Sequence, residues 1–312
     1  MKRHNHYMAY IAYSLVFILG LIVIAAMVLF RGDLATDYLE QKYTDNQSKF
    51  IEVEGVRTHY KIEGQGPYLV LIHGTAASLH TWDAWTELLA EEFTIVRLDI
   101  PAFGLTGATK ERDYSIEFYS KFLDSFVNQL GIEKFSIAGN SLGGSIAWYY
   151  STQHTDKVER LILIDAGGIP GRALPPIFTI AQNALGGYLL TKTSSRWFIQ
   201  KNMEQVYFDD NKVTESLIDR YWELGLREGA RQAFVDRARM PLQVHDHLLY
   251  DLQIPTLVMW GRDDQWIPVD NAYEFDRRLP NSQLLIYDNA GHVPMEEIPL
   301  QTANDARDFL LQ

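Results

Sequence analysis

The chain of 312 residues contains no cysteine and is short of basic charge. Without cysteine there is no disulfide, no thiolate metal site and no cysteine nucleophile, although this leaves the cellular compartment open. The 40 acidic residues outnumber the 28 basic ones and give a net charge of −12. Binding of nucleic acid needs a basic face that neutralises phosphates, so we expect no nucleic-acid partner. Apolar residues make up 47% of the chain, which is enough for a large core.

One long stretch of the chain has no charge at all. Residues 8–30 contain no Asp, Glu, Lys or Arg, and as a helix they would rise about 35 Å, enough to cross the hydrocarbon core of a bilayer. A buried core helix would have a polar face, and a cleaved signal peptide has a shorter apolar run that ends at small residues. Basic residues precede the stretch and acidic residues follow it: Lys2, Arg3, Asp33, Asp37 and Glu40. We therefore expect a retained single-pass membrane anchor, with a cytoplasmic N-terminus and an extracytoplasmic main domain.

Three regions follow from the pattern: a stub and anchor at 1–31, a polar linker or short helical stalk at 32–49, and a main domain at 50–312. In the main domain, buried-strand runs such as YLVLIHG alternate with helical sequence. This alternation predicts an α/β fold with a mostly parallel sheet flanked by helices. Between about 167 and 248 the buried-strand pattern stops and aromatic-rich helical sequence replaces it. We expect this insertion to form a helical cap over the C-terminal ends of the strands, where ligands bind in such sheets.

A short glycine-rich segment lies between one predicted strand and the next helix. Residues 139–143, GNSLG, fit the pattern G-x-S-x-G with Ser141 at its centre. Glycine at both ends would relieve crowding in a tight turn, and the helix N-terminus would favour a developing negative charge near the serine. A phosphate-binding or purely structural turn fits the same five residues, so the pattern alone does not assign the serine a role.

Two later loops supply the partners that a serine nucleophile needs. A serine hydroxyl requires a base, and the base requires a carboxylate that orients it. The segment GRDDQWIP contains Asp263 and Asp264, and the segment NAGHVPMEE contains His292. Asp165, after another strand, is a rival for the acid. The chain order serine, aspartate, histidine, with each residue after a strand, predicts a catalytic triad.

These motifs, together with LIHGTAASLHTWDAW, RLDIPAFGLTG and GNSLGGSIAW, resemble the α/β-hydrolase superfamily over the whole chain from about residue 50. Within it, the segments are similar to those of bacterial serine esterases and lipases. The acid turn of that superfamily reads G-x-x-D-x-x-x-P, and this register selects Asp264 rather than Asp263. The resemblance therefore implies the triad Ser141, Asp264 and His292.

An oxyanion hole should complete the site. One donor is expected from the backbone N–H of Leu142, directly after the nucleophile, and the resemblance implies the N–H of Thr75 as the second. His73 precedes this loop and is expected to fix its position rather than to react.

Ester hydrolysis is the activity that these features favour. Meta-cleavage-product hydrolases, which break carbon–carbon bonds, have similar segments but tend to have tryptophan where this chain has Val293. We expect a membrane-anchored carboxylesterase or lipase that forms an acyl-enzyme on Ser141. Two alternatives stay open: a carbon–carbon bond hydrolase, and a non-catalytic binding protein with the hydrolase fold. No cofactor is expected, and no metal either, because His245 and His247 have no third ligand nearby in the sequence.

Overall fold

The computed structural model describes residues 13–18, 20, 29–170, 175–241 and 244–312. The anchor expected at 8–30 lies mostly outside these residues. Among the residues that are described, no helix combines the length and the apolar character needed to cross a membrane.

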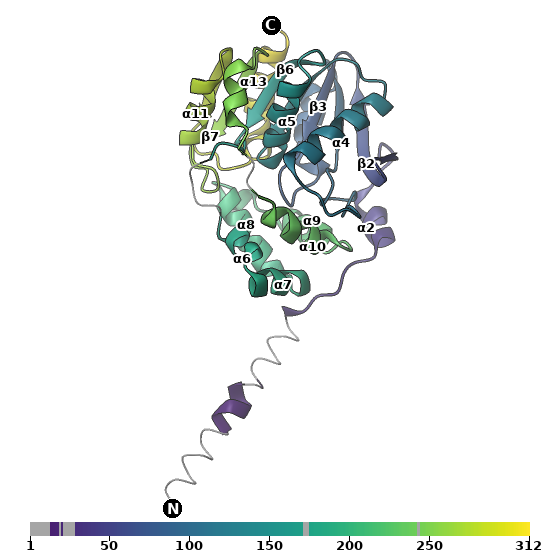
Figure 1. The fold of residues 1–312 in the computed structure, drawn as a ribbon, viewed down its shortest axis with the longest axis vertical. Helices are drawn as coiled ribbons and strands as arrows, with labels where there is room; N and C mark the ends of the chain where they lie inside the picture. Colours follow the sequence, from purple (N-terminus) through teal and green to yellow (C-terminus); the bar gives the residue numbers. More distant parts are fainter. Residues whose placement is uncertain (1–12, 19, 21–28, 171–174, 242–243) are drawn as a thin grey trace, which may run out of the picture.

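An eight-stranded sheet forms the centre of the main domain, in the order β1-β2-β4-β3-β5-β6-β7-β8 (Figure 1). The strands are β1 (Lys49–Val53), β2 (Val56–Gly64), β3 (Tyr68–Ile72), β4 (Thr94–Leu98), β5 (Phe135–Asn140), β6 (Val158–Ile164), β7 (Thr256–Gly261) and β8 (Ser282–Tyr287). The strands β1 and β2 pair antiparallel with each other, and β2 is antiparallel to β4. The six strands from β3 to β8 are parallel to one another, which confirms the mostly parallel sheet expected from the sequence.

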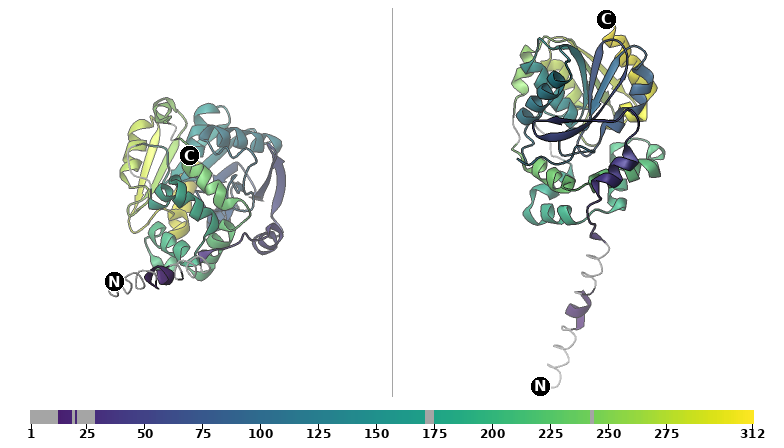
Figure 2. Two further views of the ribbon diagram at one scale, coloured as in Figure 1. Left: turned by 60° about the horizontal axis from the view of Figure 1, so that its bottom comes forward. Right: turned by 90° about the vertical axis from the view of Figure 1, so that its right-hand side faces the viewer.

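Helices cover both faces of the sheet (Figure 2). They are α3 (Asp83–Leu89), α4 (Ile116–Gln129), α5 (Leu142–Gln153), α11 (Asp270–Arg278), α12 (Pro294–Glu297) and α13 (Pro299–Leu310). Successive side chains of a strand point to opposite faces, so each buried strand contributes to two cores. In β5, Ile137 packs into the core under α4 and α5, whereas Ala138 packs into the core under α3 and α13. A strand buried on both sides has to be apolar throughout, which is why these strands could be recognised in the sequence.

Five helices inserted between β6 and β7 form the cap, which lies across one end of the sheet (Figure 1). They are α6 (Pro176–Gln182), α7 (Ala184–Lys192), α8 (Arg196–Val206), α9 (Glu215–Gly225) and α10 (Ala230–Arg239). All strands from β3 onwards are parallel, so their C-terminal ends meet at one edge. The cap lies at that edge, because it follows β6 directly and packs on the turns after β5 and β8.

The segment at 32–49, expected to be a linker or a short helical stalk, contains a helix that packs against the main domain. This helix is α2 (Thr36–Tyr43), whose Leu39 is fully buried against Leu105 and Leu224. Lys42 of α2 also pairs with Glu223 of the cap helix α9 at 2.7 Å. A single leucine with a neighbouring charge is too weak a pattern to predict docking, although the tertiary contacts make α2 part of the main domain.

Candidate active site

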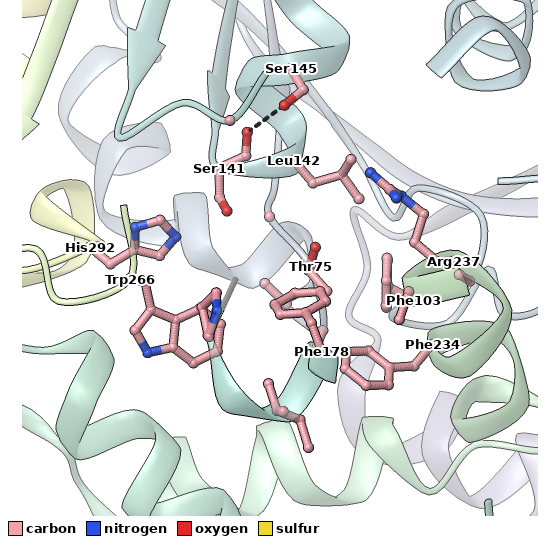
Figure 3. Close-up of a pocket in the computed structure, with 18 of the residues that line it drawn as sticks. Thr75, Phe103, Ser141, Leu142, Ser145, Phe178, Phe234, Arg237, Trp266 and His292 are labelled. Atoms are coloured by element: carbon pink, nitrogen blue, oxygen red, sulfur yellow. Dashed lines mark hydrogen bonds between the residues drawn. The ribbon is translucent and has the colours of Figure 1, made fainter. Parts of the chain in front are cut away.

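Ser141 occupies the turn between β5 and α5 with an unusual backbone conformation. Its φ is +55° and its ψ is −116°, in a region that residues with a side chain rarely adopt and that clusters at functional sites. A Cβ added at Gly139 would clash with the carbonyl of Gly143, and one added at Gly143 would clash with the carbonyl of Ile72. Both glycines are therefore required by close approach, and the tight turn lets the side chain of Ser141 point into a cavity (Figure 3).

Asp264 holds the imidazole of His292. The Nδ1 atom of His292 lies 2.7 Å from Oδ2 of Asp264, and both side chains are buried. The other carboxylate oxygen of Asp264 accepts the backbone N–H groups of Trp266 and Ile267 at 2.7 and 2.9 Å. Asp263 is exposed and does not contact the histidine. The structure thus brings Asp264, not its neighbour, to His292, and fixes the carboxylate from both sides.

The turns that carry Ser141 and His292 are joined by Asn140. Its amide donates to the carbonyl of His292 at 2.9 Å and to the carbonyl of Ile164 at 3.1 Å. Figure 3 shows the imidazole and the serine side chain on the same cavity. Within the described chain no hydrogen bond joins them, and such bonds are often long before a substrate binds. The N–H of His292 also donates to the carbonyl of Val206 at 2.7 Å, so the cap contacts the histidine turn directly.

The turn after β3 lies against the nucleophile. A Cβ added at Gly74 would come within 3.1 Å of the Cβ of Ser141, which shows how closely the two turns approach. Neither the N–H of Thr75 nor that of Leu142 enters a turn or loop hydrogen bond in the part of the chain that is described. Both donors are therefore free to bind an oxygen that develops negative charge.

His73 fixes this turn, as the sequence predicted. The ring is fully buried; Nδ1 donates to the carbonyl of Gly74 at 2.7 Å, and Nε2 accepts the N–H of Ile100 at 3.1 Å. Burial lowers the pKa of His73 below its usual value, so the ring stays neutral and can accept at Nε2. The loop that carries Thr75 is in this way joined to the loop after β4.

Asp165, the rival acid, lies beside Asp264 instead of replacing it. Its Oδ1 accepts the N–H of Gly261 at 3.0 Å. Burial, and next the negative charge of Asp264, raise the pKa of Asp165 well above its usual 3.8. Ligand atoms of Asp165, Asp264 and His292 lie within 4.8 Å of one another, close enough to surround a metal ion. The raised pKa of Asp165 disfavours the ionised form that a metal ion would need, and His292 already uses Nδ1 to bond Asp264.

A cavity of about 500 Å³ separates the strand ends from the cap. Ser141 and His292 open into it from the sheet, and Phe178 and Phe234 from the cap (Figure 3). Trp266 lines it as well and stacks on the imidazole of His292, with ring centroids 5.8 Å apart. This contact could not be predicted from the sequence, in which Trp266 is only an aromatic residue within the acid turn.

The fold and the geometry of this site are found together in a known protein family. The chain belongs to the alpha/beta hydrolase fold family, whose model matches residues 67–299. The resemblance stated from the sequence motifs is thereby confirmed.

Similar proteins include enzymes with different substrates. A hydrolase of 2-hydroxy-6-oxo-6-(2'-aminophenyl)hexa-2,4-dienoic acid from Metapseudomonas resinovorans is 27% identical over 293 residues, which cover 90% of this chain and 95% of the relative. A solved serine hydrolase involved in carbazole degradation is 26% identical with a TM-score of 0.73, over 84% of this chain and 98% of that one. A solved membrane phospholipase A, described as a bacterial virulence factor, is 25% identical with a TM-score of 0.75, over 99% of this chain and 98% of that one.

Proposed function

We propose that the protein hydrolyses carboxylic esters through an acyl-enzyme on Ser141. His292 takes the proton of the hydroxyl as Oγ attacks the ester carbonyl, and the N–H groups of Thr75 and Leu142 stabilise the oxyanion. The protonated imidazole then gives this proton to the departing alcohol. Water, deprotonated by His292, releases the acid and restores the serine. Asp264 stays ionised throughout and stabilises the imidazolium.

The observation that carries this proposal is the hydrogen bond of 2.7 Å between Asp264 and His292, on the cavity into which the strained Ser141 turn opens. A binding protein with this fold would need neither a strained serine nor an oriented imidazole. Two free backbone donors beside the serine add to the support, because acyl transfer places an oxyanion at that position.

Carbon–carbon bond hydrolysis is the second possibility, and the names of several relatives favour it. Those relatives act on 2-hydroxy-6-oxo-dienoates or related acids. Val293 supports ester hydrolysis instead, because carbon–carbon bond hydrolases tend to have tryptophan at this position. Val293 is 4% exposed, follows His292 and lines the cavity, so the difference lies where the substrate binds. Assaying one 2-hydroxy-6-oxo-dienoate beside p-nitrophenyl esters separates the two activities, since the proposal requires the larger kcat/KM on the esters.

A membrane anchor at residues 8–30 is the second part of the proposal. Its support is the uncharged sequence, together with the similarity to a membrane phospholipase A over 99% of this chain. Phe30 and Thr193 form an isolated antiparallel β-bridge, and the N–H of Arg31 donates to the carbonyl of Lys192 at 3.2 Å. The chain that follows the proposed anchor therefore begins beside the C-terminal end of the cap helix α7. If residues 8–30 span the membrane, these contacts make the cap the part of the main domain nearest the bilayer. Resistance of the full-length protein to extraction from membranes by carbonate is the test, and its release would contradict the anchor.

The test of the enzyme is labelling and turnover. Full-length protein in detergent should react with a fluorophosphonate and hydrolyse p-nitrophenyl butyrate, and Ser141→Ala should abolish both. Loss of a triad nucleophile costs about 10⁶-fold in the best-studied case, so activity within tenfold of wild type would reject the serine mechanism. Ser151→Ala is the matched control, because Ser151 lies in the same helix α5 but outside the cavity lining.

A further inference from the structure

Two arginines of the cap helix α10, Arg231 and Arg237, line the cavity, and the proposed reaction uses neither. Arg237 lies in the last turn of α10 and lines the cavity together with Ser141. Figure 3 shows its guanidinium pointing from α10 into the cavity toward Leu142, with His292 on the other side of Ser141. The group is therefore within the volume that a substrate must fill.

Arg237 has no partner of its own within the described chain. Its Nε is shielded from solvent and makes no hydrogen bond. Burial lowers the pKa of the guanidinium, and among the described residues only the phenol of Tyr119, not a carboxylate, opposes that effect. The adjacent Asp236 pairs instead with Arg112 at 2.6 Å. A partly buried guanidinium without a counter-ion is costly, because the Coulombic gain that normally offsets desolvation is missing.

Other arginines of the cap region are engaged or lie elsewhere. Arg231 also lines the cavity, but it pairs with Asp33 at 2.6 Å and donates to the carbonyl of Arg31 at 2.8 Å. Arg196 pairs with Asp219 at 2.6 Å. Arg239, two residues along the same helix, donates to the carbonyls of Ala181 and Asn183 and does not line the cavity. Arg227 has an unpaired Nε too, although it lies against Gly107 and outside the cavity lining. Arg237 thus combines a missing partner with a place in the cavity.

We infer that Arg237 binds an anionic group, carboxylate or phosphate, carried by the ester substrate. This inference rests on the proposed esterase function and names the class of its substrate. A guanidinium presents a planar pair of donors that matches a carboxylate or phosphate, and such charge-assisted bonds are strong away from water. The rest of the cavity is largely apolar, so the ester carries its anion at one end of an apolar body. The anion resides either on the acyl chain, as a second carboxylate, or on the alcohol, as a phosphate.

Two pairs of substrates test this inference and separate the two sources. The first pair is the p-nitrophenyl monoester of adipic acid and its neutral methyl ester. The second is a lysophosphatidic acid and the monoacylglycerol with the same acyl chain. In full-length protein we expect a higher kcat/KM for the anionic member of one pair, and that pair identifies whether the acyl or the alcohol part carries the anion.

Substitution of the arginine should remove this preference. Hydrogen bonds to charged groups contribute about 1.5–3 kcal/mol, so Arg237→Gln should lower the anionic-to-neutral ratio of kcat/KM about 10- to 100-fold. Arg237→Lys should retain part of it, and Arg239→Gln, which removes the same charge from the same turn, should keep the ratio within about twofold. Arg237→Met should melt at the same temperature as wild type or higher, because it removes an unpaired, partly buried charge. A lower Tm would indicate a structural arginine and contradict the inference.

The outcomes separate this inference from the function on which it depends. Wild type that cleaves neutral esters through Ser141 but shows no preference in either pair would overturn the anion site alone. A preference that survives in Arg237→Gln would do the same. Wild type that cleaves no ester would overturn the proposed function and this inference with it.

Discussion

The two walls of the cavity are built differently. On the sheet wall, the polar atoms near the proposed nucleophile are held by specific bonds: Asp264 by two backbone N–H groups and His292, and His73 by two loops. The cap wall consists mainly of aromatic and aliphatic side chains, with the unpartnered Arg237 among them. Fixed dipoles are what transition-state stabilisation needs, whereas a mainly apolar wall with one unpartnered charge is suited to choosing a substrate. This difference suggests that the sheet determines the reaction and the cap determines its substrate.

The largest effect should come from the sheet wall. Asp264→Asn should lower kcat about 10³- to 10⁴-fold, because the amide leaves His292 in the wrong tautomer and without a counter-charge. Steady-state hydrolysis of p-nitrophenyl butyrate measures this. The adjacent Asp263→Asn is the control and should change kcat less than threefold, since Asp263 is exposed. Equal losses in the two variants would contradict the assignment of the acid.

Cap substitutions should change preference rather than abolish turnover. Phe234 lines the cavity and lies 5.6 Å from Phe178 between ring centroids. Phe234→Ala should widen the cavity and shift the preferred p-nitrophenyl ester toward longer acyl chains, with the ratio of long to short esters rising about tenfold, as one methylene discriminates by 1–3 kcal/mol. Trp197→Ala is the control, because Trp197 is 64% exposed and outside the lining. An unchanged chain-length profile would place the acyl group elsewhere.

Asp165 allows a test of the buried acid pair by pH. Its pKa is raised on folding, so its contribution to stability is complete below its usual 3.8 and is lost as pH rises toward the folded value. Across that window the folded protein holds one proton that the unfolded chain has released, and this lowers the free energy of unfolding by about 1.4 kcal/mol per pH unit. Asp165→Asn removes the effect.

The comparison is made by urea unfolding from pH 5 to pH 8. The free energy of unfolding of Asp165→Asn, relative to wild type, should increase with pH. Asp263→Asn provides the matched change at an exposed aspartate. A difference between Asp165→Asn and wild type that stays constant with pH would mean that Asp165 is ionised in the folded protein.

The smallest effect should come from the outer surface of the cap. Leu185, Tyr188 and Leu189 of α7 are 67%, 60% and 47% exposed and share one helix face. If the anchor brings this face to the bilayer, Leu185→Asp with Leu189→Asp should lower turnover of a phospholipid in vesicles about three- to tenfold. Turnover of soluble p-nitrophenyl butyrate should stay within twofold of wild type. A parallel loss on both substrates would point to a damaged cap and contradict membrane contact by α7.

Much of the sheet wall could be predicted because its signals are local. The clash that requires glycine at 139 arises within five residues, and a strand buried on both faces has to be apolar. The clash at Gly143 is with the carbonyl of Ile72, so that glycine is required by the neighbouring strand. The order of Ser141, Asp264 and His292 along the chain therefore predicted which turns would meet. The family resemblance added the choice of Asp264 over Asp263, and the structure has the same carboxylate against His292.

The remaining features depend on contacts between residues far apart in the chain. Docking of α2 through Leu39, the stacking of Trp266 on His292, and the place of Asp165 beside Asp264 join segments that no local pattern connects. The same holds for Arg237: in the sequence it is one charge on an amphipathic helix, and only the packing of the cap over the sheet turns it inward without a partner. Local sterics and periodicity are written in neighbouring residues, so the sequence determined the turns and strands. The environment of a charge depends on everything packed around it, and that was decided by the tertiary structure.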